Sequence, residues 1–376
     1  MARKTIIIRC NEVFSDPRAM KYIQFLKENR LDYYIIGWDR SGVIHSDASN
    51  VSFYHRKAGY NVGGIKAIVN RIGWMFFVLK KLIAFKGKNL FIHACDLDAV
   101  YPSIIYKTFF RKKNVYVLFD IFDWFSATLY SQPKIVLRAF KHMEKVSLHK
   151  CDKVLLCEKE RVEQIPFILP SSKLSILPNI PYFSSAEFLR FDKEMRFNNN
   201  LITFSYVGGF AQSRCINEII TIAEQKQINL LIAGFGDLQI ENRLNSLKGH
   251  PHLRYYGKVK YTDGLNIMYN SDVIYAMYSK INPNHIYAAP NKYYEAMFLG
   301  KPLFSTRGTI VEKKVLSNKT GYVSEESEGE IKDVISSITR ESIKEYGDNS
   351  HRLWIEKYCT YTSDWLNNEY RSFIKD

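Results

Sequence analysis

The sequence predicts an α/β protein made of two doubly wound domains, and three observations lead to this fold class. Short β-branched or aromatic runs alternate along the chain with segments whose apolar residues recur at helical spacing. Apolar residues make up 46% and charged residues 24% of the 376 positions, which is typical of globular proteins and excludes disorder as the main state. The alternation breaks near residues 178–200, where Pro, Ser and Asn accumulate as they do in linkers.

The first half of the chain predicts a parallel sheet with helices on its faces. Its pattern gives strands at 5–10, 33–38, 89–94, 114–119 and 153–157, and helices at 17–29 and 134–150. We therefore expect an N-terminal domain at residues 1–180, followed by a linker at 181–200.

The second half of the chain repeats this pattern. Strands are predicted at 202–207, 229–233, 253–256, 273–277 and 302–305, and helices at 216–226, 238–247, 264–270 and 292–299. These elements predict a C-terminal domain at 201–349. Aromatic residues at helical spacing then predict helices at 350–376.

The net charge is compatible with three classes of partner. With 53 Lys and Arg against 38 Asp and Glu, the net charge is +15, which suits nucleic acid, an anionic membrane surface or phosphate-bearing small ligands. No apolar run approaches the roughly 20 residues that cross a bilayer, and the N-terminus lacks the apolar core of a signal peptide, so we expect a cytoplasmic protein. The 6 Cys and the 9 His are scattered, which disfavours a metal site with soft ligands.

Two glycine loops in the second half are candidate ligand sites. One predicted strand ends in Gly208-Gly209 with Arg214 just before the next helix, and the following strand ends in Gly234 and Gly236. Glycines let the backbone approach a ligand, while a helix N-terminus and an arginine favour an anion, so this pattern suits a diphosphate. An ordinary strand-to-helix turn with an exposed arginine explains it equally well. The spacing is not GxGxxG, which disfavours a nicotinamide dehydrogenase.

A third pattern surrounds Lys292 and Glu295, which lie in a predicted helix that Gly300 ends. We expect Glu295 in the first turn of this helix, where a carboxylate interacts with the helix dipole or receives ribose hydroxyls. A glutamate that only stabilises the helix is the alternative.

The stretch from Lys292 through Glu295 and Gly300 to Pro302, placed after the glycine loops and Arg214, resembles the donor-binding half of GT-B nucleotide-sugar glycosyltransferases, group 1 or family 4-like. The resemblance implies a GT-B fold, in which two Rossmann-like domains face a central cleft and the C-terminal helices pack back on an acceptor-binding N-terminal domain. It also implies that Glu295 holds the donor ribose, that Arg214 and nearby backbone amides hold the diphosphate, and that no metal or further cofactor takes part. The expected donor-binding residues are Gly208, Gly209, Arg214, Gly234, Lys292 and Glu295.

The sequence departs from this family pattern at two positions. Tyr287 stands where family 4 enzymes usually carry the first of two glutamates, and the lysine that usually follows the arginine shortly is missing after Arg214. These departures leave the donor sugar and the stereochemistry of transfer open.

Acidic residues after predicted strands of the first domain are candidate bases for the acceptor hydroxyl. An inverting transfer needs such a base, whereas a retaining one can proceed without it. Asp120 and Asp123 are the preferred catalytic candidates, with His93, Asp96 and Asp98 as others. Loop capping explains any one of them equally well.

Residues 65–88 mix aromatic and aliphatic side chains with six Lys and Arg. This pattern suits a helix that lies in an anionic membrane interface, extended by residues 109–113 and 134–150. A buried helix whose lysines reach solvent is the alternative. Docking would place the protein on the inner face of the cell membrane and make a lipid-linked saccharide the natural acceptor.

The sequence therefore predicts a glycosyltransferase of surface polysaccharide biosynthesis. A nucleotide-sugar epimerase of the same fold is the nearest alternative. A basic nucleic-acid-binding protein is the third hypothesis, but the 25 Tyr and 24 Phe are spread through the predicted strands and helices as core residues are, so no nucleic acid partner is expected.

Overall fold

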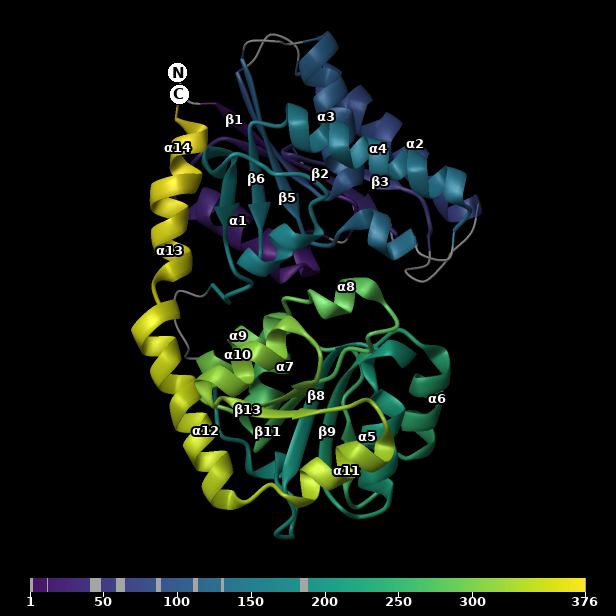
Figure 1. The fold of residues 1–376 in the computed structure, drawn as a ribbon, viewed down its shortest axis with the longest axis vertical. Helices are drawn as coiled ribbons and strands as arrows, with labels where there is room; N and C mark the ends of the chain where they lie inside the picture. Colours follow the sequence, from purple (N-terminus) through teal and green to yellow (C-terminus); the bar gives the residue numbers. More distant parts are fainter. Residues whose placement is uncertain are drawn as a thin grey trace. The chain divides into compact units, whose positions relative to one another are not determined.

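The computed structural model describes residues 3–11, 13–40, 49–58, 65–85, 89–110, 114–129, 132–182 and 189–375 of the chain. The chain divides into two compact units. Unit 1 consists of Met1–Pro178 and Thr362–Asp376, and unit 2 consists of Asn179–Tyr361. Each unit has its own parallel sheet with helices around it (Figure 1). The predicted α/β class with two doubly wound domains is therefore confirmed.

Unit 1 is built around a parallel sheet, with seven strands in the described residues. The strands are β1 (Lys4–Arg9), β2 (Tyr33–Asp39), β3 (Val51–His55), β4 (Leu90–Cys95), β5 (Val115–Ile121), β6 (Lys153–Leu156) and β7 (Leu174–Ile176). Their spatial order is β3-β2-β1-β4-β5-β6-β7. The order changes direction between β1 and β4, so their carboxyl ends form the switch point of this sheet.

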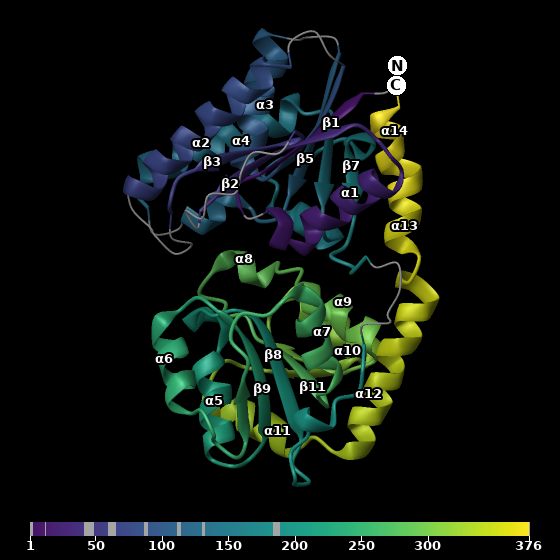
Figure 2. The same ribbon diagram turned by 180° about the vertical axis from the view of Figure 1, so that it is seen from behind.

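Helices cover both faces of the first sheet. On one face, α2 (Ile65–Ile83), α3 (Leu97–Phe109) and α4 (Lys134–Lys150) lie side by side, whereas α1 (Pro17–Glu28) and a C-terminal segment with α13 (Tyr361–Trp365) and α14 (Arg371–Ile374) lie on the other (Figures 1 and 2). The helix α1 begins at Pro17 because the carboxylate of Asp16 accepts the free backbone N–H groups of its first turn.

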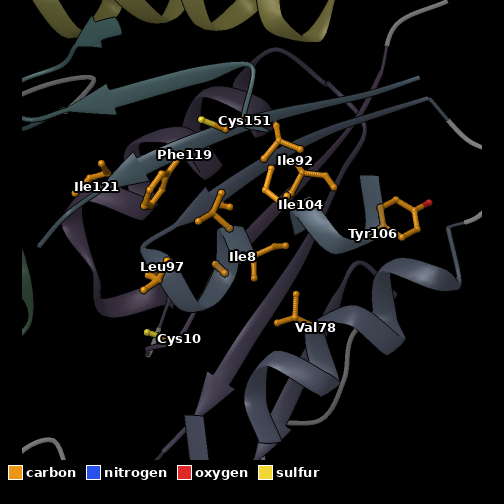
Figure 3. Packing of buried hydrophobic residues seen from close by; sticks show 14 of the residues in the cluster. Ile8, Cys10, Val78, Ile92, Leu97, Ile104, Tyr106, Phe119, Ile121 and Cys151 are labelled. Atoms are coloured by element: carbon orange, nitrogen blue, oxygen red, sulfur yellow. The ribbon is translucent and has the colours of Figure 1, made fainter. Parts of the chain in front are cut away.

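One core cluster of unit 1 lies between the sheet and the layer of α2, α3 and α4. Strand residues such as Ile8, Ile92 and Phe119 pack there against Val78 of α2 and Leu97 of α3 (Figure 3). All five are buried, and this apolar burial is the main stabilising contribution of the packing.

Unit 2 repeats the doubly wound plan around a sheet with six strands in the described residues. Its strands are β8 (Thr203–Gly209), β9 (Asn229–Phe235), β10 (Leu253–Tyr255), β11 (Val273–Ala276), β12 (Leu303–Thr306) and β13 (Gly321–Ser324). The spatial order is β10-β9-β8-β11-β12-β13, so the switch point lies between β8 and β11.

The helices of unit 2 follow its strands and surround the sheet. They are α5 (Ile216–Glu224), α6 (Leu238–Ser246), α7 (Tyr261–Tyr269), α8 (Pro283–Ile286), α9 (Asn291–Leu299), α10 (Ile310–Asn318), α11 (Glu328–Ser336) and α12 (Arg340–Leu353). A helix that follows a parallel strand starts at the carboxyl edge of the sheet. The first turns of α5 and α9 therefore lie at the edge where such sheets bind ligands.

Within the described ranges, none of the helices has both the length and the apolar character that crossing a bilayer requires.

Candidate functional site

The candidate site of unit 2 lies at the switch point of its sheet. Arg214 belongs to the short turn after β8, and Tyr278 follows the end of β11. The guanidinium carbon of Arg214 lies 4.1 Å from the centroid of the Tyr278 ring. The backbone N–H of Ser279 also donates to the carbonyl of Ser213 at 2.8 Å. Two loops that are far apart in the sequence are thus joined at the place where open α/β sheets bind their ligands.

One nitrogen of Arg214 lacks a partner. Nη1 is buried and has no hydrogen-bond partner among the residues that the structure describes. A buried N–H without an acceptor costs free energy, and such groups are rare in folded proteins. A phosphate or carboxylate oxygen would provide the missing acceptor, and a guanidinium holds such anions in a fixed geometry.

The glycines beside Arg214 differ in how strictly the packing requires them. Gly208 pairs with Gly234 across β8 and β9. A Cβ atom on Gly234 would lie 1.9 Å from the carbonyl oxygen of Gly208, and the φ of Gly234 is +149°. A Cβ atom on Gly209 would meet nothing within 4 Å. Gly234 is therefore required by close backbone approach, whereas Gly209 leaves open space at the end of its strand.

The N-terminus of α5 completes this edge. Cys215 precedes the helix with φ 50° and ψ 41°, a left-handed conformation that is uncommon outside glycine. Its carbonyl accepts a hydrogen bond from the hydroxyl of Tyr275 at 2.8 Å, which fixes the start of the helix. Burial raises the pKa of the Cys215 thiol to about 12, so the thiol is neutral and inert at physiological pH. The first turn of α5 presents backbone N–H groups that can donate hydrogen bonds to an anion.

The second part of the predicted site is a buried carboxylate with two donors. Glu295 is fully buried, and its Oε2 accepts from Nζ of Lys292 at 2.6 Å. Its Oε1 accepts from the hydroxyl of Tyr261 at 2.8 Å. Burial beside this carboxylate raises the pKa of Tyr261 well above its usual value. Glu295 thus orients Lys292, whose side chain is still 17% exposed.

The position of Glu295 in its helix differs from our expectation. The helix α9 begins at Asn291 and has no acidic residue in its first turn. Glu295 therefore lies in the second turn, and its placement in the first turn was wrong. Its charge is balanced by the side chain of Lys292 rather than by the free N–H groups of the helix start.

Two residues of this region were missed by the sequence analysis. Tyr278 stacks on Arg214, and the buried His285 lies edge-on to Tyr278 with a centroid distance of 5.5 Å. His285 is fixed by a contact of 2.8 Å between its Nδ1 and the carbonyl of Ser279. The sequence feature that could have indicated Tyr278 is its position just after a predicted strand that ends at the switch point. His285 gave no signal, because it lies in the four-residue helix α8. Tyr287, which replaces the family glutamate, follows that helix directly.

The preferred catalytic candidates of unit 1 have very different surroundings. Asp120 is fully buried and accepts hydrogen bonds from Arg18, Tyr22 and His93. Burial opposes its charged form, but the charge of Arg18 and the hydrogen bonds from His93 and Arg18 outweigh it and hold the pKa of Asp120 well below its usual range. The side chain of Asp123 is 68% exposed and lies 3.5 Å from Arg161. A catalytic role for either carboxylate stays a prediction.

Asp96, another candidate, holds together the loops at the switch point of the first sheet. It forms an ion pair with Arg9 and accepts from the backbone N–H of Phe122 at 2.9 Å. Its φ is +69° with ψ 173°, a region that non-glycine residues rarely occupy. Burial raises the pKa of Asp96 to about 6. Asp98 is likewise buried and paired with Arg71.

One trio in unit 1 has the spacing of a metal site. His93, Cys95 and Asp120 each bring a ligand atom within 4.8 Å of the others, and all three are buried. The two nitrogens of His93 already contact the hydroxyl of Tyr370 at 2.9 Å and Asp120 at 3.1 Å. Burial raises the pKa of the Cys95 thiol well above its usual value, which opposes the thiolate that a metal needs. The donor set therefore fits a hydrogen-bonded core better than a metal ion.

No protein-family model and no curated protein sequence matches the chain. Solved structures do match it over nearly its whole length. Sucrose-phosphate synthase from Thermosynechococcus elongatus aligns over 98% of this chain and 99% of its own, with a TM-score of 0.71 and 15% identity. HepE from Anabaena, in complex with UDP-glucose, aligns over 98% and 99%, with a TM-score of 0.67 and 11% identity. A protein from Listeria monocytogenes described as a UDP-N-acetylglucosamine 2-epimerase aligns over 100% and 97%, with a TM-score of 0.60 and 11% identity.

These similarities define the class of fold. The chain has the GT-B fold, as the resemblance in its second half predicted, and that prediction is confirmed. At 11% to 15% identity, the similarities establish the fold and leave the reaction to be argued from the site.

Proposed function

We propose that the protein is a glycosyltransferase that moves a sugar from a nucleotide-diphosphate sugar to a glycan acceptor, and that unit 2 binds the donor. The observation that carries the proposal is the buried, unpartnered Nη1 of Arg214 among the described residues at the switch point of the second sheet. A diphosphate supplies the acceptor oxygens and the negative charge that such a group lacks. The UDP-glucose bound to the structurally similar HepE supports this class of ligand.

The proposed roles follow from the contacts in unit 2. Transfer breaks the bond between the anomeric carbon of the sugar and the diphosphate oxygen, on which negative charge develops. Arg214 and the N–H groups at the start of α5 stabilise that charge. Gly209 leaves room for the diphosphate to approach the backbone, and the close pairing of Gly208 with Gly234 shapes the same edge of the sheet. Lys292, which Glu295 orients, supplies a further cation.

Glu295 is proposed to hold the donor ribose, as the family resemblance implies. A ribose hydroxyl would have to share or displace the hydrogen bonds that Tyr261 and Lys292 now make to this carboxylate. On the acceptor side, Asp120 and Asp123 remain the proposed bases. Of the two, Asp123 has the exposure that contact with an acceptor requires.

The acceptor is proposed to be a lipid-linked saccharide of a surface polysaccharide, which the protein meets while attached to the inner face of the cell membrane. The support for this part is the mixture of exposed apolar and basic side chains on the helices of unit 1. The reaction needs no metal or further cofactor in this proposal, because cationic side chains and helix N–H groups balance the diphosphate charge.

A nucleotide-sugar epimerase is the second candidate function. The specific observation in its favour is the similarity to the Listeria protein described as a UDP-N-acetylglucosamine 2-epimerase. Such an enzyme would use the same donor site without a glycan acceptor.

Two measurements test the proposal. A thermal-shift screen with UDP, GDP, CMP and NAD should show stabilisation by one nucleoside diphosphate, because a ligand that binds the folded state raises its stability by mass action. NMR of the matching nucleotide sugar with a saccharide acceptor then separates the reactions. Transfer joins the anomeric carbon to an acceptor hydroxyl and releases the nucleoside diphosphate, whereas epimerisation leaves the sugar attached to it. If no nucleotide stabilises the protein, the proposed donor site is wrong.

A further inference from the structure

The helix α2 has an exposed apolar stripe. The residues Val69, Ile72, Phe76 and Ile83, here called the apolar stripe, are 51%, 44%, 70% and 36% exposed. Their spacing of three, four and seven residues places them on one face of the helix. Lys80, which is exposed on the same face, adds a cation to the stripe.

The core does not need this stripe. Trp74, Val78 and Leu82 are fully buried and lie on the opposite face of α2, where they pack into the core of unit 1. A surface helix usually presents polar residues on the face that points away from the core. The helix α2 is apolar on both faces, so its outer face fits a partner that is itself apolar.

The neighbouring helices add cations and further apolar side chains. On α4, the exposed residues Lys134, Arg138, Lys141 and Lys145, here called the basic row, recur at spacings of four, three and four and so share one face. The acidic residue of this helix, Glu144, is 3% exposed and accepts from the backbone N–H of Ser126.

The exposed apolar side chains continue beyond α2. Phe109 at the end of α3 is 77% exposed, and Ile135 at the start of α4 is 78% exposed. The helices α2, α3 and α4 lie side by side on the same face of the first sheet in both views (Figures 1 and 2). The cations of residues 86–88 and 111–113, which the sequence analysis assigned to the same surface, lie outside the described residues.

We propose that this face of unit 1 docks on an anionic lipid bilayer, with the apolar stripe of α2 inserted among the acyl chains and the basic row of α4 on the lipid headgroups. The combination decides between partners. A second copy of the protein would explain the apolar stripe, but it would not explain a row of cations on a helix without exposed acidic residues. Nucleic acid would explain the cations, but it would not explain the exposed Phe76 and Ile72. An anionic membrane interface satisfies both.

This inference deepens the proposed function by naming the surface through which the enzyme would reach a lipid-linked acceptor. It involves only unit 1, whereas the donor site lies in unit 2. The two can therefore fail separately.

The test is flotation of the full chain with vesicles of phosphatidylcholine, with and without phosphatidylglycerol, at low and at high salt. The wild type should bind the anionic vesicles at low salt and lose much of this binding at high salt. The triple variant Val69→Gln, Ile72→Gln, Phe76→Gln keeps helix propensity and should weaken binding about tenfold or more. Its matched control changes Ile168, Leu316 and Ile355, which are at least half exposed, to Gln and should bind as the wild type does.

A second pair of variants tests the charges. Each lysine near an anionic surface contributes about a fivefold factor in affinity, so Lys141→Gln with Lys145→Gln should weaken binding about 25-fold. The control pair Lys248→Gln with Lys313→Gln removes two exposed lysines of unit 2 and should leave vesicle binding unchanged.

Several outcomes would overturn the proposal. The first is a wild type that does not bind anionic vesicles at low salt. The second is an equal loss of vesicle binding in the test and control variants. The third is a dimer, seen by light scattering, that the triple glutamine variant abolishes while its vesicle binding stays unchanged. The thermal shift with nucleotides is measured on the same samples. Vesicle binding without any nucleotide shift would support docking and reject the proposed transfer, and the reverse result would reject docking alone.

Discussion

Replacing Arg214 by alanine is the most direct test of the donor site. The change removes a guanidinium that is stacked on Tyr278 and whose Nη1 lacks a hydrogen-bond partner in the described part of the chain. In the nucleotide-free protein this should change stability little. The loss of the cation–π contact, about 0.5–1 kcal/mol, is offset by removal of a buried unpaired donor that costs about 1–3 kcal/mol.

Nucleotide binding should respond much more strongly. A hydrogen bond to a charged group contributes about 1.5–3 kcal/mol, so losing one such bond to the diphosphate should raise the Kd about 10- to 150-fold. At a ligand concentration of about 100 times the wild-type Kd, the ligand stabilises the wild type by about 2.7 kcal/mol. For the variant the same concentration should give only about 0.3–1.4 kcal/mol. Arg214→Lys keeps the charge but loses the planar fork, so its Kd should fall between the two.

The assay is isothermal titration with the nucleoside diphosphate found in the screen, together with thermal unfolding at matched ligand concentrations. Arg254 provides a matched control, because it also stacks on an aromatic ring and also has a buried nitrogen without a partner among the described residues. It lies in β10, next to Phe197, and away from the switch point. If Arg254→Ala lowers nucleotide affinity as much as Arg214→Ala does, or if neither changes it, the assignment of the diphosphate site is refuted.

Three further predictions concern the glycines, the buried glutamate and the core of unit 1. Gly234→Ala should destabilise the protein by about 3 kcal/mol or more in denaturant unfolding, because its Cβ would lie 1.9 Å from a backbone oxygen, whereas Gly209→Ala should be nearly neutral. Glu295→Gln should lower stability by about 1–3 kcal/mol and weaken nucleotide binding, since it removes the buried charge that Tyr261 and Lys292 contact. The pKa of His93 is lowered by burial, and that of Asp120 is lowered by the charge of Arg18 and by the hydrogen bonds from His93 and Arg18. The Tm should therefore fall first as pH drops below about 6.5, and again below about 4.

The sign of the acid effect follows from proton binding. Both groups bind protons more weakly in the folded protein than in the unfolded chain, so acid favours unfolding. His93→Gln should remove the upper step of the Tm profile and keep the lower one. A variant that retains both steps would show that His93 is not the group responsible. For the glycines, equal stability of the two alanine variants would contradict the predicted close approach, and for Glu295→Gln an unchanged Kd would remove it from the donor site.

The alternation of strands and helices predicted most of both sheets, and the strands that it missed share one property. The strands β3, β7 and β13 each lie at an edge of a sheet. An edge strand has one neighbour, so it needs fewer β-forming residues, and β7 has only three residues. Such short segments carry too little periodic signal to be separated from loops.

The parts of the candidate site formed by residues close together in the sequence could be predicted. The contacts between residues far apart in the sequence could not. Gly208 and Gly209 end one predicted strand and Arg214 follows it, so their order alone places them at one edge of the sheet. Arg18 and Asp120 are 102 residues apart, and only the fold brings them together. The sequence placed Asp120 after buried residues of a strand, but it held no information on whether the carboxylate would face an acceptor or a buried arginine.

The contacts of Asp120 suit a role in stability, whereas those of Arg214 suit the proposed binding of an anion. Asp120 is ionised and can only accept, so His93 donates from Nε2, and the neutral imidazole then accepts at Nδ1 from Tyr370. Every charged atom in that cluster has a partner, so a ligand would have to break existing bonds to enter. Nη1 of Arg214 is an unpaired donor that is already buried in the folded protein. The free energy of removing it from water was therefore lost during folding. A ligand that supplies the acceptor gains the hydrogen bond without that cost. An arginine at the switch point with an unpaired nitrogen therefore indicates an anion site, whereas a carboxylate whose oxygens are all paired indicates a place in the core.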